Sequence, residues 1–391
     1  MIDVEVGTTL VRRLLRERNR VSAAVFPAEC AHLAEACREM AERFLRGGRL
    51  LAFGRRHYLT DAQHVSVEFV HPVIVGKRAL PALDLSAAFE AWVPSVARPD
   101  DIAMGFGPPG GDPAVASTLE AAGRAGVQTF GFTPSVADYS LASPTDDPFV
   151  HQEIVEVLYH TLWETVHVFF EHRERGHDAG AAAFLYPFLG EQKQDTRNLV
   201  SDVAASIRLK AEDDERLRDE VGANEAPRVL QAAEIIAERL EAGGTVLLFG
   251  NGGSATDAND WALDFAVPVK PFRPARAVSL AMEPANLSAI ANDIGQDAIF
   301  LRQLIAQARP GDVAIAISTS GGSANVIAAL EEARKRGLAT VALLGCEGGE
   351  IVRRGLADVS LVVRSDYIPR IQEVQASIYH VIVEVVGHLR P

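Results

Sequence analysis

The sequence predicts an α/β protein built from two tandem, doubly wound domains, each a parallel sheet flanked by helices. The first observation behind this prediction is an internal repeat, in which residues 53–69 align without a gap on residues 249–265. The second is a series of short, fully apolar segments that alternate with helical patterns, as in parallel sheets covered on both faces. Because a repeat constrains the architecture of the whole chain, we expect one domain at residues 1–183 and another at residues 184–391.

The repeat is clearest after the first predicted strand of each half. FGRRHYLTDAQHVSVEF begins at Phe53 and FGNGGSATDANDWALDF at Phe249, and both copies share Thr-Asp-Ala and the closing Phe. Near the ends of the two halves, Gln-Glu and Tyr-His pairs recur at identical spacing, at Gln152-Glu153 and Tyr159-His160 and at Gln372-Glu373 and Tyr379-His380.

The elements of the first half follow from periodicity and from glycine punctuation. An apolar face predicts a helix over about 27–46, which Gly47-Gly48 ends. Strands are expected at 49–53, 79–85, 101–106 and 128–132, and further helices at 113–125 and about 147–172.

The second half repeats this order and adds one block. We expect a helix at about 226–241, strands at 245–249, 275–281, 312–318, 339–345 and 359–363, and helices at 323–336 and about 369–388. The helical stretch around 287–308 has no counterpart in the first half. A charged, Ala/Gly-rich connector is expected at 172–183, and the strongly charged helical pattern at 192–221 is assigned to the second half.

Composition limits the class of protein. A hydrophobic fraction of 48% and a charged fraction of 23% are those of an ordinary globular protein. The net charge of −14 argues against nucleic acid or an anionic membrane surface as a general partner, although it does not exclude a small anion. Three cysteines do not make a disulfide framework, and no apolar run is long enough to span a membrane. We therefore expect a cytoplasmic protein.

Two loops of the second half have the composition of phosphate sites. Each follows an apolar strand and leads into a helix, so that glycines would let the backbone approach an anion and the N–H groups of the helix start would point at it. The residues concerned are Asn251, Gly252, Gly253 and Ser254 in the first loop, and Ser318, Thr319, Ser320 and Ser323 in the second. The alternative is that these glycines and hydroxyls only form turns and helix caps.

The corresponding loops of the first half do not have this character. They read Arg55-Arg56-His57-Tyr58 and Gly107-Pro108-Pro109-Gly110-Gly111-Asp112. Proline has no N–H to donate, and an aspartate would repel phosphate. We expect that the first half has lost its anion pocket.

The second half contains four motifs in order: GNGGS, AND-x-G, STSGGSANV, and RIQE with a histidine eight residues after its Gln. In this combination the sequence resembles the sedoheptulose-7-phosphate isomerase (phosphoheptose isomerase) family of the sugar isomerase (SIS) fold. The resemblance is strong over about 192–391 and weak over 20–172. It implies a sugar-phosphate aldose–ketose isomerase that binds no nucleotide cofactor. It also implies substrate contacts by Asp293 and Gln372.

The resemblance further implies a site for acid–base chemistry and metal binding. In that family, a His and a Glu four residues apart and a Gln and a His eight residues apart flank the reacting carbons and in several members hold zinc. The first half has the whole set, His64, Glu68, Gln152 and His160, whereas the second half has Asp260, Asp264, Gln372 and His380. Pro369 stands where an aspartate is usual. Zinc or another divalent ion is the implied cofactor, and the alternative is that the four residues are a retained structural feature.

Two catalytic schemes remain open on the sequence. In one, the phosphate loops of the second half combine with Glu68 as base and His160 as its acid/base partner. In the other, Asp264 is the base and His380 the partner. A non-catalytic, sugar-phosphate-binding regulatory or scaffold protein is the alternative function. We expect a homodimer of tandem modules, with four SIS modules in all.

Overall fold

The computed structural model describes residues 3–72, 77–174 and 196–390. It divides into two compact units, Arg20–Asp213 (the first unit) and Met1–Asn19 with Asp214–Pro391 (the second unit). The predicted domain boundary between residues 183 and 184 lies outside the described residues and stays a prediction. In the described part of the chain, no helix is both long and apolar enough to cross a lipid bilayer.

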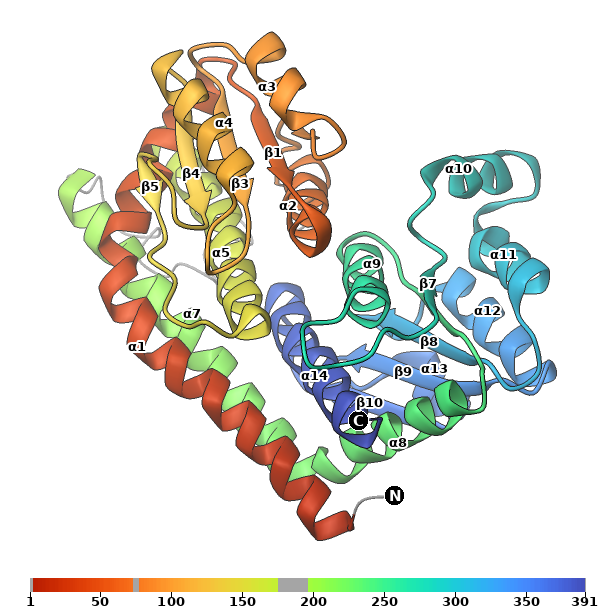
Figure 1. The fold of residues 1–391 in the computed structure, drawn as a ribbon. Helices are drawn as coiled ribbons and strands as arrows, with labels where there is room; N and C mark the ends of the chain where they lie inside the picture. Colours follow the sequence, from red (N-terminus) through yellow and green to blue (C-terminus); the bar gives the residue numbers. More distant parts are fainter. Residues whose placement is uncertain (1–2, 73–76, 175–195, 391) are drawn as a thin grey trace. The chain divides into compact units, whose positions relative to one another are not determined.

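The first unit contains a five-stranded parallel sheet with the order β2-β1-β3-β4-β5 (Figure 1). Its elements in chain order are α1 (Val4–Leu45), β1 (Leu50–Gly54), η1 (Arg56–Tyr58), α2 (Leu59–Val70), β2 (Ala82–Asp84), α3 (Phe89–Val96), β3 (Ile102–Phe106), α4 (Pro113–Arg124), β4 (Gln128–Phe132), β5 (Tyr139–Ser140) and α5 (Pro148–Glu174).

The second unit contains a parallel sheet with the order β10-β9-β8-β6-β7. Its elements are α7 (Thr196–Asn224), α8 (Ala226–Glu241), β6 (Val246–Phe249), α9 (Gly253–Ala266), β7 (Ala277–Ser279), α10 (Pro284–Asp293), η3 (Gln296–Ala298), α11 (Ile299–Gln307), β8 (Val313–Ser318), α12 (Ala324–Lys335), β9 (Ala339–Gly345), α13 (Gly349–Arg353), β10 (Val359–Val363) and α14 (Ile368–Leu389).

The two sheets have the same topology, which confirms the predicted fold class. In each sheet the first strand of the chain lies next to an edge strand. The chain continues from it to that edge strand and then returns to the strand on its other side, from β1 through β2 to β3 and from β6 through β7 to β8. Ligands of such sheets bind beyond the carboxyl ends of the strands at this switch point. The loops after β6 and β8 lie at that position in the second unit.

The core shows why the sheets are covered on both faces. Successive side chains of a strand point to opposite faces. In the first unit, Leu50 and Ala52 of β1 belong to one hydrophobic cluster with residues of α1, α2 and α5. Leu51 and Phe53 belong to another cluster, with residues of α3 and α4. Burial on both faces is the reason that the strands read as continuous apolar runs.

Helices α1 and α7 each contribute to both units. Residues of α1 up to Asn19 group with the second unit, and residues of α7 up to Asp213 group with the first. With Phe53 aligned on Phe249, the 42-residue α1 corresponds to α7 and α8 together, so the exchange is reciprocal between the repeats. The assignment of the whole charged helix to the second half is therefore corrected, because Val203, Ile207 and Ala211 pack in the core of the first unit.

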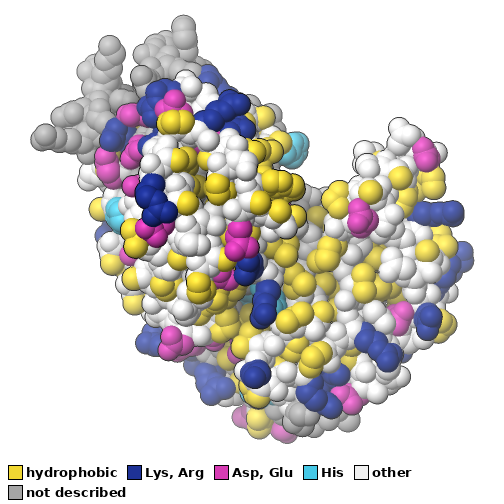
Figure 2. All heavy atoms as spheres, turned by 45° about the horizontal axis from the view of Figure 1, so that its top comes forward, with side chains coloured by type: hydrophobic (Ala, Val, Ile, Leu, Met, Phe, Trp, Pro, Cys, Tyr) yellow, Lys and Arg dark blue, Asp and Glu magenta, His cyan; other side chains and the backbone are white. Residues whose placement is uncertain are grey.

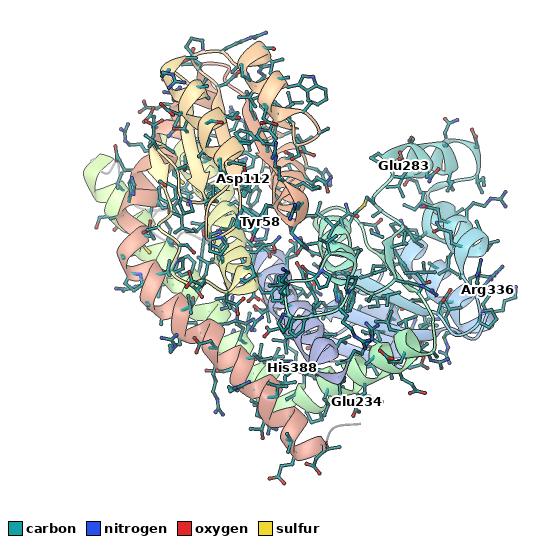
Figure 3. All side chains as sticks on the ribbon, in the orientation of Figure 1. Tyr58, Asp112, Glu234, Glu283, Arg336 and His388 are labelled. Carbon is teal, nitrogen blue, oxygen red and sulfur yellow. The ribbon has the colours of Figure 1, made fainter. Side chains whose placement is uncertain are left out.

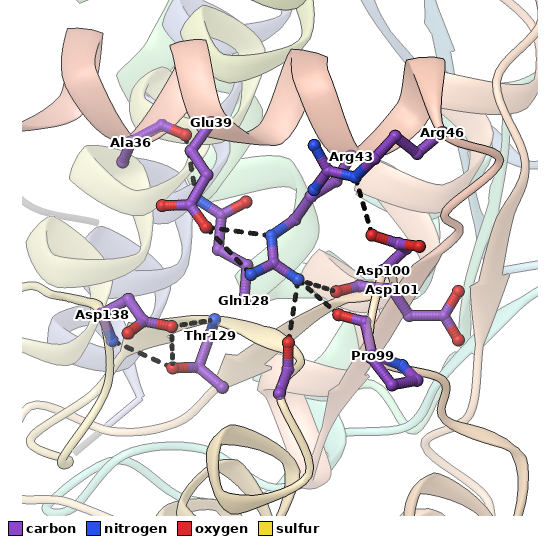
Figure 4. Close-up of polar contacts among 11 residues, drawn as sticks. Ala36, Glu39, Arg43, Arg46, Pro99, Asp100, Asp101, Gln128, Thr129 and Asp138 are labelled. Carbon is purple, nitrogen blue, oxygen red and sulfur yellow. Dashed lines mark hydrogen bonds and ion pairs between the residues drawn. The ribbon is translucent and has the colours of Figure 1, made fainter.

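The C-terminal end of α1 is fixed to the first sheet by polar contacts (Figure 4). Arg43 donates to the carbonyl oxygens of Pro99 at 2.6 Å and Gly126 at 3.0 Å, and Arg46 pairs with Asp100 at 2.7 Å. Gln128 of β4 donates to the Ala36 carbonyl oxygen at 3.0 Å. These contacts hold the helix across the turns that precede β3 and β4.

Candidate functional site

The first glycine-rich loop joins β6 to α9 in a conformation that requires glycine. A Cβ on Gly250 would lie 2.5 Å from the carbonyl oxygen of Ser254, and Gly252, the residue before α9, has a φ of 58°. No side chain caps the start of α9. The first-turn N–H groups of Gly253 and Ser254 therefore face a position where an anion would be stabilised by the helix start.

The second loop joins β8 to α12 and is ordered by its own hydroxyls. Ser318 accepts from the N–H of Gly321 at 3.0 Å, and Ser320 accepts from the N–H of Gly322 at 3.2 Å. Gly321 has a φ of 62°, and a Cβ there would lie 2.2 Å from the carbonyl oxygen of Gly348. Ser323, the residue before α12, makes no side-chain cap bond. Its hydroxyl therefore does not accept from the first N–H groups of this helix.

Asn325, which the sequence reasoning missed, joins the two loops. The amides of Asn251 and Asn325 exchange two hydrogen bonds, each of 2.9 Å. Since β6 and β8 are neighbouring strands, this pair fixes one loop against the other at the carboxyl edge of the sheet. Asn325 belongs to the STSGGSANV motif, and its position in the first turn of α12 was the signal that could have identified it.

The first unit fills the corresponding edge with its own groups. Asp112 caps α4 by accepting from the N–H groups of Ala114 at 2.9 Å and Val115 at 3.2 Å, so its carboxylate holds the position that an anion would take. Asp112 and Tyr58 both lie at this edge of the first sheet (Figure 3). Arg55 pairs with Glu90 at 2.6 Å and lies over the ring of Phe89.

His151 of α5 also lies at the carboxyl edge of the first sheet. Its Nε2 is 3.1 Å from the carbonyl oxygens of Gly107 and Phe132. Gly107 directly follows β3, and Phe132 is the last residue of β4. Burial lowers the pKa of His151, although the two carbonyl groups partly oppose this effect. The ring thus contacts two carbonyl groups and closes the edge on which the second unit has its open loops.

A buried cluster in the second unit brings together three of the predicted catalytic and metal residues. Asp260 and Asp264 lie one turn apart on α9 and face His380 of α14. The Nε2 atom of His380 is 3.4 Å from Oδ2 of Asp260 and 3.5 Å from Oδ2 of Asp264. All three side chains are almost completely buried. Two carboxylates and an imidazole thus share a water-poor site.

The cluster is surrounded by further buried contacts. Tyr379 stacks on Trp261 and donates its hydroxyl to Oδ2 of Asp260 at 3.0 Å. Glu373 is buried and pairs with Arg370 at 2.7 Å. Arg370 also pairs with Asp214 of α7 at 2.8 Å, which fixes the start of α14.

The first unit holds a cluster of similar geometry. His64 and Glu68 lie one turn apart on α2, with Nε2 and Oε1 separated by 3.9 Å, and the Nε2 atoms of His64 and His160 are 3.3 Å apart. Gln152 contacts α2 one turn earlier, where its amide donates to Asp61 at 3.2 Å. Three members of the predicted quartet thus converge on one point, and the fourth lies on an adjacent turn.

Both clusters fit a divalent metal ion by donor type and spacing. The ligand atoms of His64, Glu68 and His160, and those of Asp260, Asp264 and His380, lie within 4.8 Å of one another in each set. Ligands that are about 2.0–2.2 Å from a zinc ion are roughly 3–4 Å apart. Imidazole nitrogen with carboxylate oxygen is a donor set that suits zinc.

The two remaining predicted substrate residues have different positions. Gln372 is buried on α14, two turns before His380. Asp293 ends α10, is exposed, and accepts from the amide of Asn292 at 2.7 Å. Helix α10 and helix α11 form the block that follows β7, and at this place the first unit has only the shorter α3.

Comparison with known proteins agrees with this fold and these loops. The SIS domain family matches residues 212–345, almost all of which lie in the second unit, so this part of the chain is an SIS domain. A phosphoheptose isomerase of Roseiflexus sp. (strain RS-1) is 42% identical over 195 residues, which cover 49% of this chain and 92% of that protein. A phosphoheptose isomerase of Chlorobaculum tepidum is 45% identical over 175 residues, covering 44% and 83%. The chain belongs to the phosphoheptose isomerase family, which confirms the predicted resemblance.

Solved structures extend the likeness to almost the whole chain. The C-terminal domain of glucosamine-fructose-6-phosphate aminotransferase from Francisella tularensis covers 97% of this chain and 96% of its own, with a TM-score of 0.63 and 11% identity. At that identity the match shows the fold alone. It supports two sheets of SIS type in one chain.

Proposed function

We propose that this chain is an aldose–ketose isomerase of sugar phosphates, with sedoheptulose 7-phosphate or a related ketose phosphate as its substrate. The observation that carries the proposal is the layout of α9. This helix begins at an uncapped glycine loop and, seven residues later, presents Asp260 and then Asp264 to His380. At 1.5 Å of rise per residue, about 10 Å separate the helix start from Asp260, a span suited to an extended ketose phosphate.

The phosphate group binds at the two loops after β6 and β8. Backbone N–H groups at the starts of α9 and α12 supply donors and the positive ends of two helix dipoles. The hydroxyls of Thr319, Ser320 and Ser323 add side-chain donors. Because Asn251 and Asn325 hold the loops together, these donors are in place before the ligand arrives.

The reaction moves a proton between C1 and C2 of the sugar. The Asp264 carboxylate removes the proton from C1 of the ketose, and the electron pair forms the double bond of the enediolate. His380 donates a proton to the C2 oxygen, takes a proton from the C1 hydroxyl as the aldehyde forms, and the proton held by Asp264 returns at C2. Burial of both groups keeps water from the intermediate.

A divalent metal ion would be held by Asp260, Asp264 and His380, or in the first unit by His64, Glu68 and His160. Such an ion would polarise the sugar carbonyl and stabilise the enediolate charge. Tyr379 would then orient Asp260 through its hydroxyl, in the way that a neighbouring donor fixes a metal-bound carboxylate.

The test compares three variants with the unmodified chain in an NMR assay of sedoheptulose 7-phosphate in D2O, with and without added zinc. Asp264→Asn should lower the rate of conversion by at least about a hundredfold, because a positioned base contributes 10²–10⁴. Asp297→Asn, an exposed control on η3, should have no effect. If Glu68→Gln abolishes turnover and Asp264→Asn does not, the base belongs to the first unit. No turnover of any phosphosugar by the unmodified chain contradicts the proposal.

A non-catalytic function is favoured by one specific observation. Asp260 and Asp264 replace a His and a Glu, and both carboxylates contact His380 directly, as in a structural cluster. A phosphosugar-binding regulator would keep the loops and dispense with the base. It would show a ligand-dependent rise in thermal stability that Ser320→Ala abolishes, without conversion of the ligand.

A further inference from the structure

A pocket in the second unit lies outside the candidate site. It has a volume of about 350 Å³, and its lining comes only from residues 12–16 of α1 and residues 218–223 of α7. None of these residues belongs to the phosphate loops, to α9 or to α14. Its volume is within the range of sites for small molecules, roughly 300–1,000 Å³.

The lining of this pocket is strongly basic. Arg12 and Arg16 lie four residues apart on α1 and therefore share one face of the helix, while Arg218 enters from α7. The opposing charge is that of Asp219, whose carboxylate accepts from the amide of Asn19 at 3.0 Å. Three arginines against Asp219, with the buried Asp214 also interacting electrostatically with Arg218, leave an excess of positive charge at the pocket, on a chain whose net charge is −14.

Two of the arginines are held in place by the fold. The Nε of Arg12 donates to the carbonyl oxygen of Gly222 at 3.0 Å, which anchors its guanidinium at the pocket. Arg218 is 1% exposed, and its Nε donates to the hydroxyl of Ser377 at 2.8 Å. Its Nη1 is buried and has no hydrogen-bond partner among the described residues. The buried guanidinium of Arg218 thus contributes positive charge beneath the pocket.

Arg16 supplies the adaptable part of the site. Its side chain is exposed and makes no hydrogen bond or ion pair within the part of the chain that the structure describes. Arginine presents a planar fork of donors that matches the oxygens of a phosphate group. The carboxylate of Asp219, in turn, can accept from a hydroxyl beside that phosphate.

We propose that this pocket binds a small phosphorylated ligand that carries hydroxyl groups, at a site separate from the phosphate loops. The phosphate lies among the guanidinium groups of Arg12, Arg16 and Arg218, and a ligand hydroxyl donates to Asp219. Because Arg218 is joined to Ser377 of α14, the ligand is in contact with a side chain that holds the helix of Gln372 and His380.

Crystals of the full chain soaked in tungstate test the site directly, since tungstate mimics phosphate and scatters anomalously. We expect one peak at the loops after β6 and β8 and a second in the pocket. Arg16→Gln should remove the pocket peak and leave the loop peak unchanged. Arg13→Gln, which removes the same charge from an exposed neighbour that does not line the pocket, should leave both. No peak in the pocket, or a pocket peak that persists in Arg16→Gln, overturns the proposal.

Titration calorimetry with inorganic phosphate separates this pocket from the proposed function. In a Ser320→Ala background, which weakens the loops, Arg16→Gln should weaken the remaining phosphate binding by about tenfold, the loss of one charged hydrogen-bonding partner. Arg13→Gln should change it less than about twofold. Loss of turnover in the isomerase assay with this binding intact would defeat only the proposed function. Tungstate density without measurable phosphate binding would mean an adventitious ion only and would overturn the pocket.

Discussion

At the scale of single residues, the pair formed by Asn251 and Asn325 determines how well the two phosphate loops are prepared for a ligand. Asn325→Ala removes both 2.9 Å hydrogen bonds and leaves the loops free to separate. We expect the KM for the phosphosugar to rise about fivefold, corresponding to about 1 kcal/mol, with kcat nearly unchanged.

Steady-state kinetics of the isomerase reaction check this prediction, with phosphosugar affinity by calorimetry as a second measurement. Asn286→Ala, an exposed asparagine of α10, is the matched control and should leave both quantities unchanged. A fall in kcat at unaltered KM would instead indicate that the asparagine pair acts on the chemical step.

Burial of His151 makes the first unit sensitive to acid. Burial lowers the pKa of this histidine in the folded chain, whereas in the unfolded chain it stays near 6.5. The unfolded state therefore binds more protons below about pH 6.5, and stability is lost as the pH falls through that range. From pH 7.5 to 5.5, His151→Gln should reduce this loss by about 1 kcal/mol.

Thermal unfolding at several pH values measures this effect. The unmodified chain should lose more stability on acidification than His151→Gln. His71→Gln, an exposed histidine at the end of α2, should keep the acid sensitivity of the unmodified chain. Parallel pH curves for the unmodified chain and His151→Gln would show that the buried ring takes up its proton as readily as a solvated one.

At the scale of elements, the equivalent helices α4 and α12 show how one fold position serves stability in one unit and ligand binding in the other. Asp112 caps α4 through two backbone N–H groups, whereas Ser323 makes no side-chain cap bond at α12. Asp112→Ala should cost about 1 kcal/mol of stability and leave phosphosugar affinity unchanged. Ser323→Ala should weaken phosphosugar affinity and leave stability unchanged.

Chemical denaturation and calorimetric titration of both variants distinguish these outcomes. Each variant serves as the control for the other, because both remove one polar group from the residue before a helix. Equal losses of stability in the two variants would contradict the assignment of the α12 start to a ligand.

The sequence predicted most elements because their determinants are local. The bounds of α8, β4, β9 and β10 follow directly from apolar runs and from adjacent glycines. It missed β5, which has only two residues, and began α1 near Pro27, although the helix runs from Val4 with that proline on its exposed face. The packing of the charged helix could not be predicted, because apolar residues of α7 contribute to the core of the first unit, a tertiary preference that periodicity does not record.

In the candidate site, too, features with local determinants were predictable and those that depend on tertiary packing were not. Glycine loops were predictable, because close backbone approach at Gly250 and Gly321 restricts the residue type. The ion pair of Arg370 with Asp214 was not predictable, since it joins residues far apart in sequence and its burial depends on how α7 packs on α14.

At the scale of the whole molecule, the repeat combines a conserved topology with edges of different chemistry. The second unit presents two open helix starts at its carboxyl edge, whereas the first closes that edge with Asp112 and His151. Both units nevertheless keep a buried imidazole–carboxylate cluster. The first unit thus lacks the open anion loops and the α10–α11 block, but it keeps the sheet and the buried cluster.

The last prediction concerns assembly and follows from apolar surface on the first unit. Leu83 on the edge strand β2 is 44% exposed, Trp92 on α3 is 46% exposed, and hydrophobic side chains are visible on this unit's surface (Figure 2). Because closed two-fold pairs are the commonest assemblies and these two side chains leave apolar area exposed, we expect a homodimer of twice the 42.1 kDa chain mass by light scattering. Trp92→Glu would bury a charge in the interface and yield monomers, whereas Val136→Glu, at a residue 78% exposed, should stay dimeric. A monomeric unmodified chain, or a dimer that survives Trp92→Glu, would show that this surface does not mediate assembly.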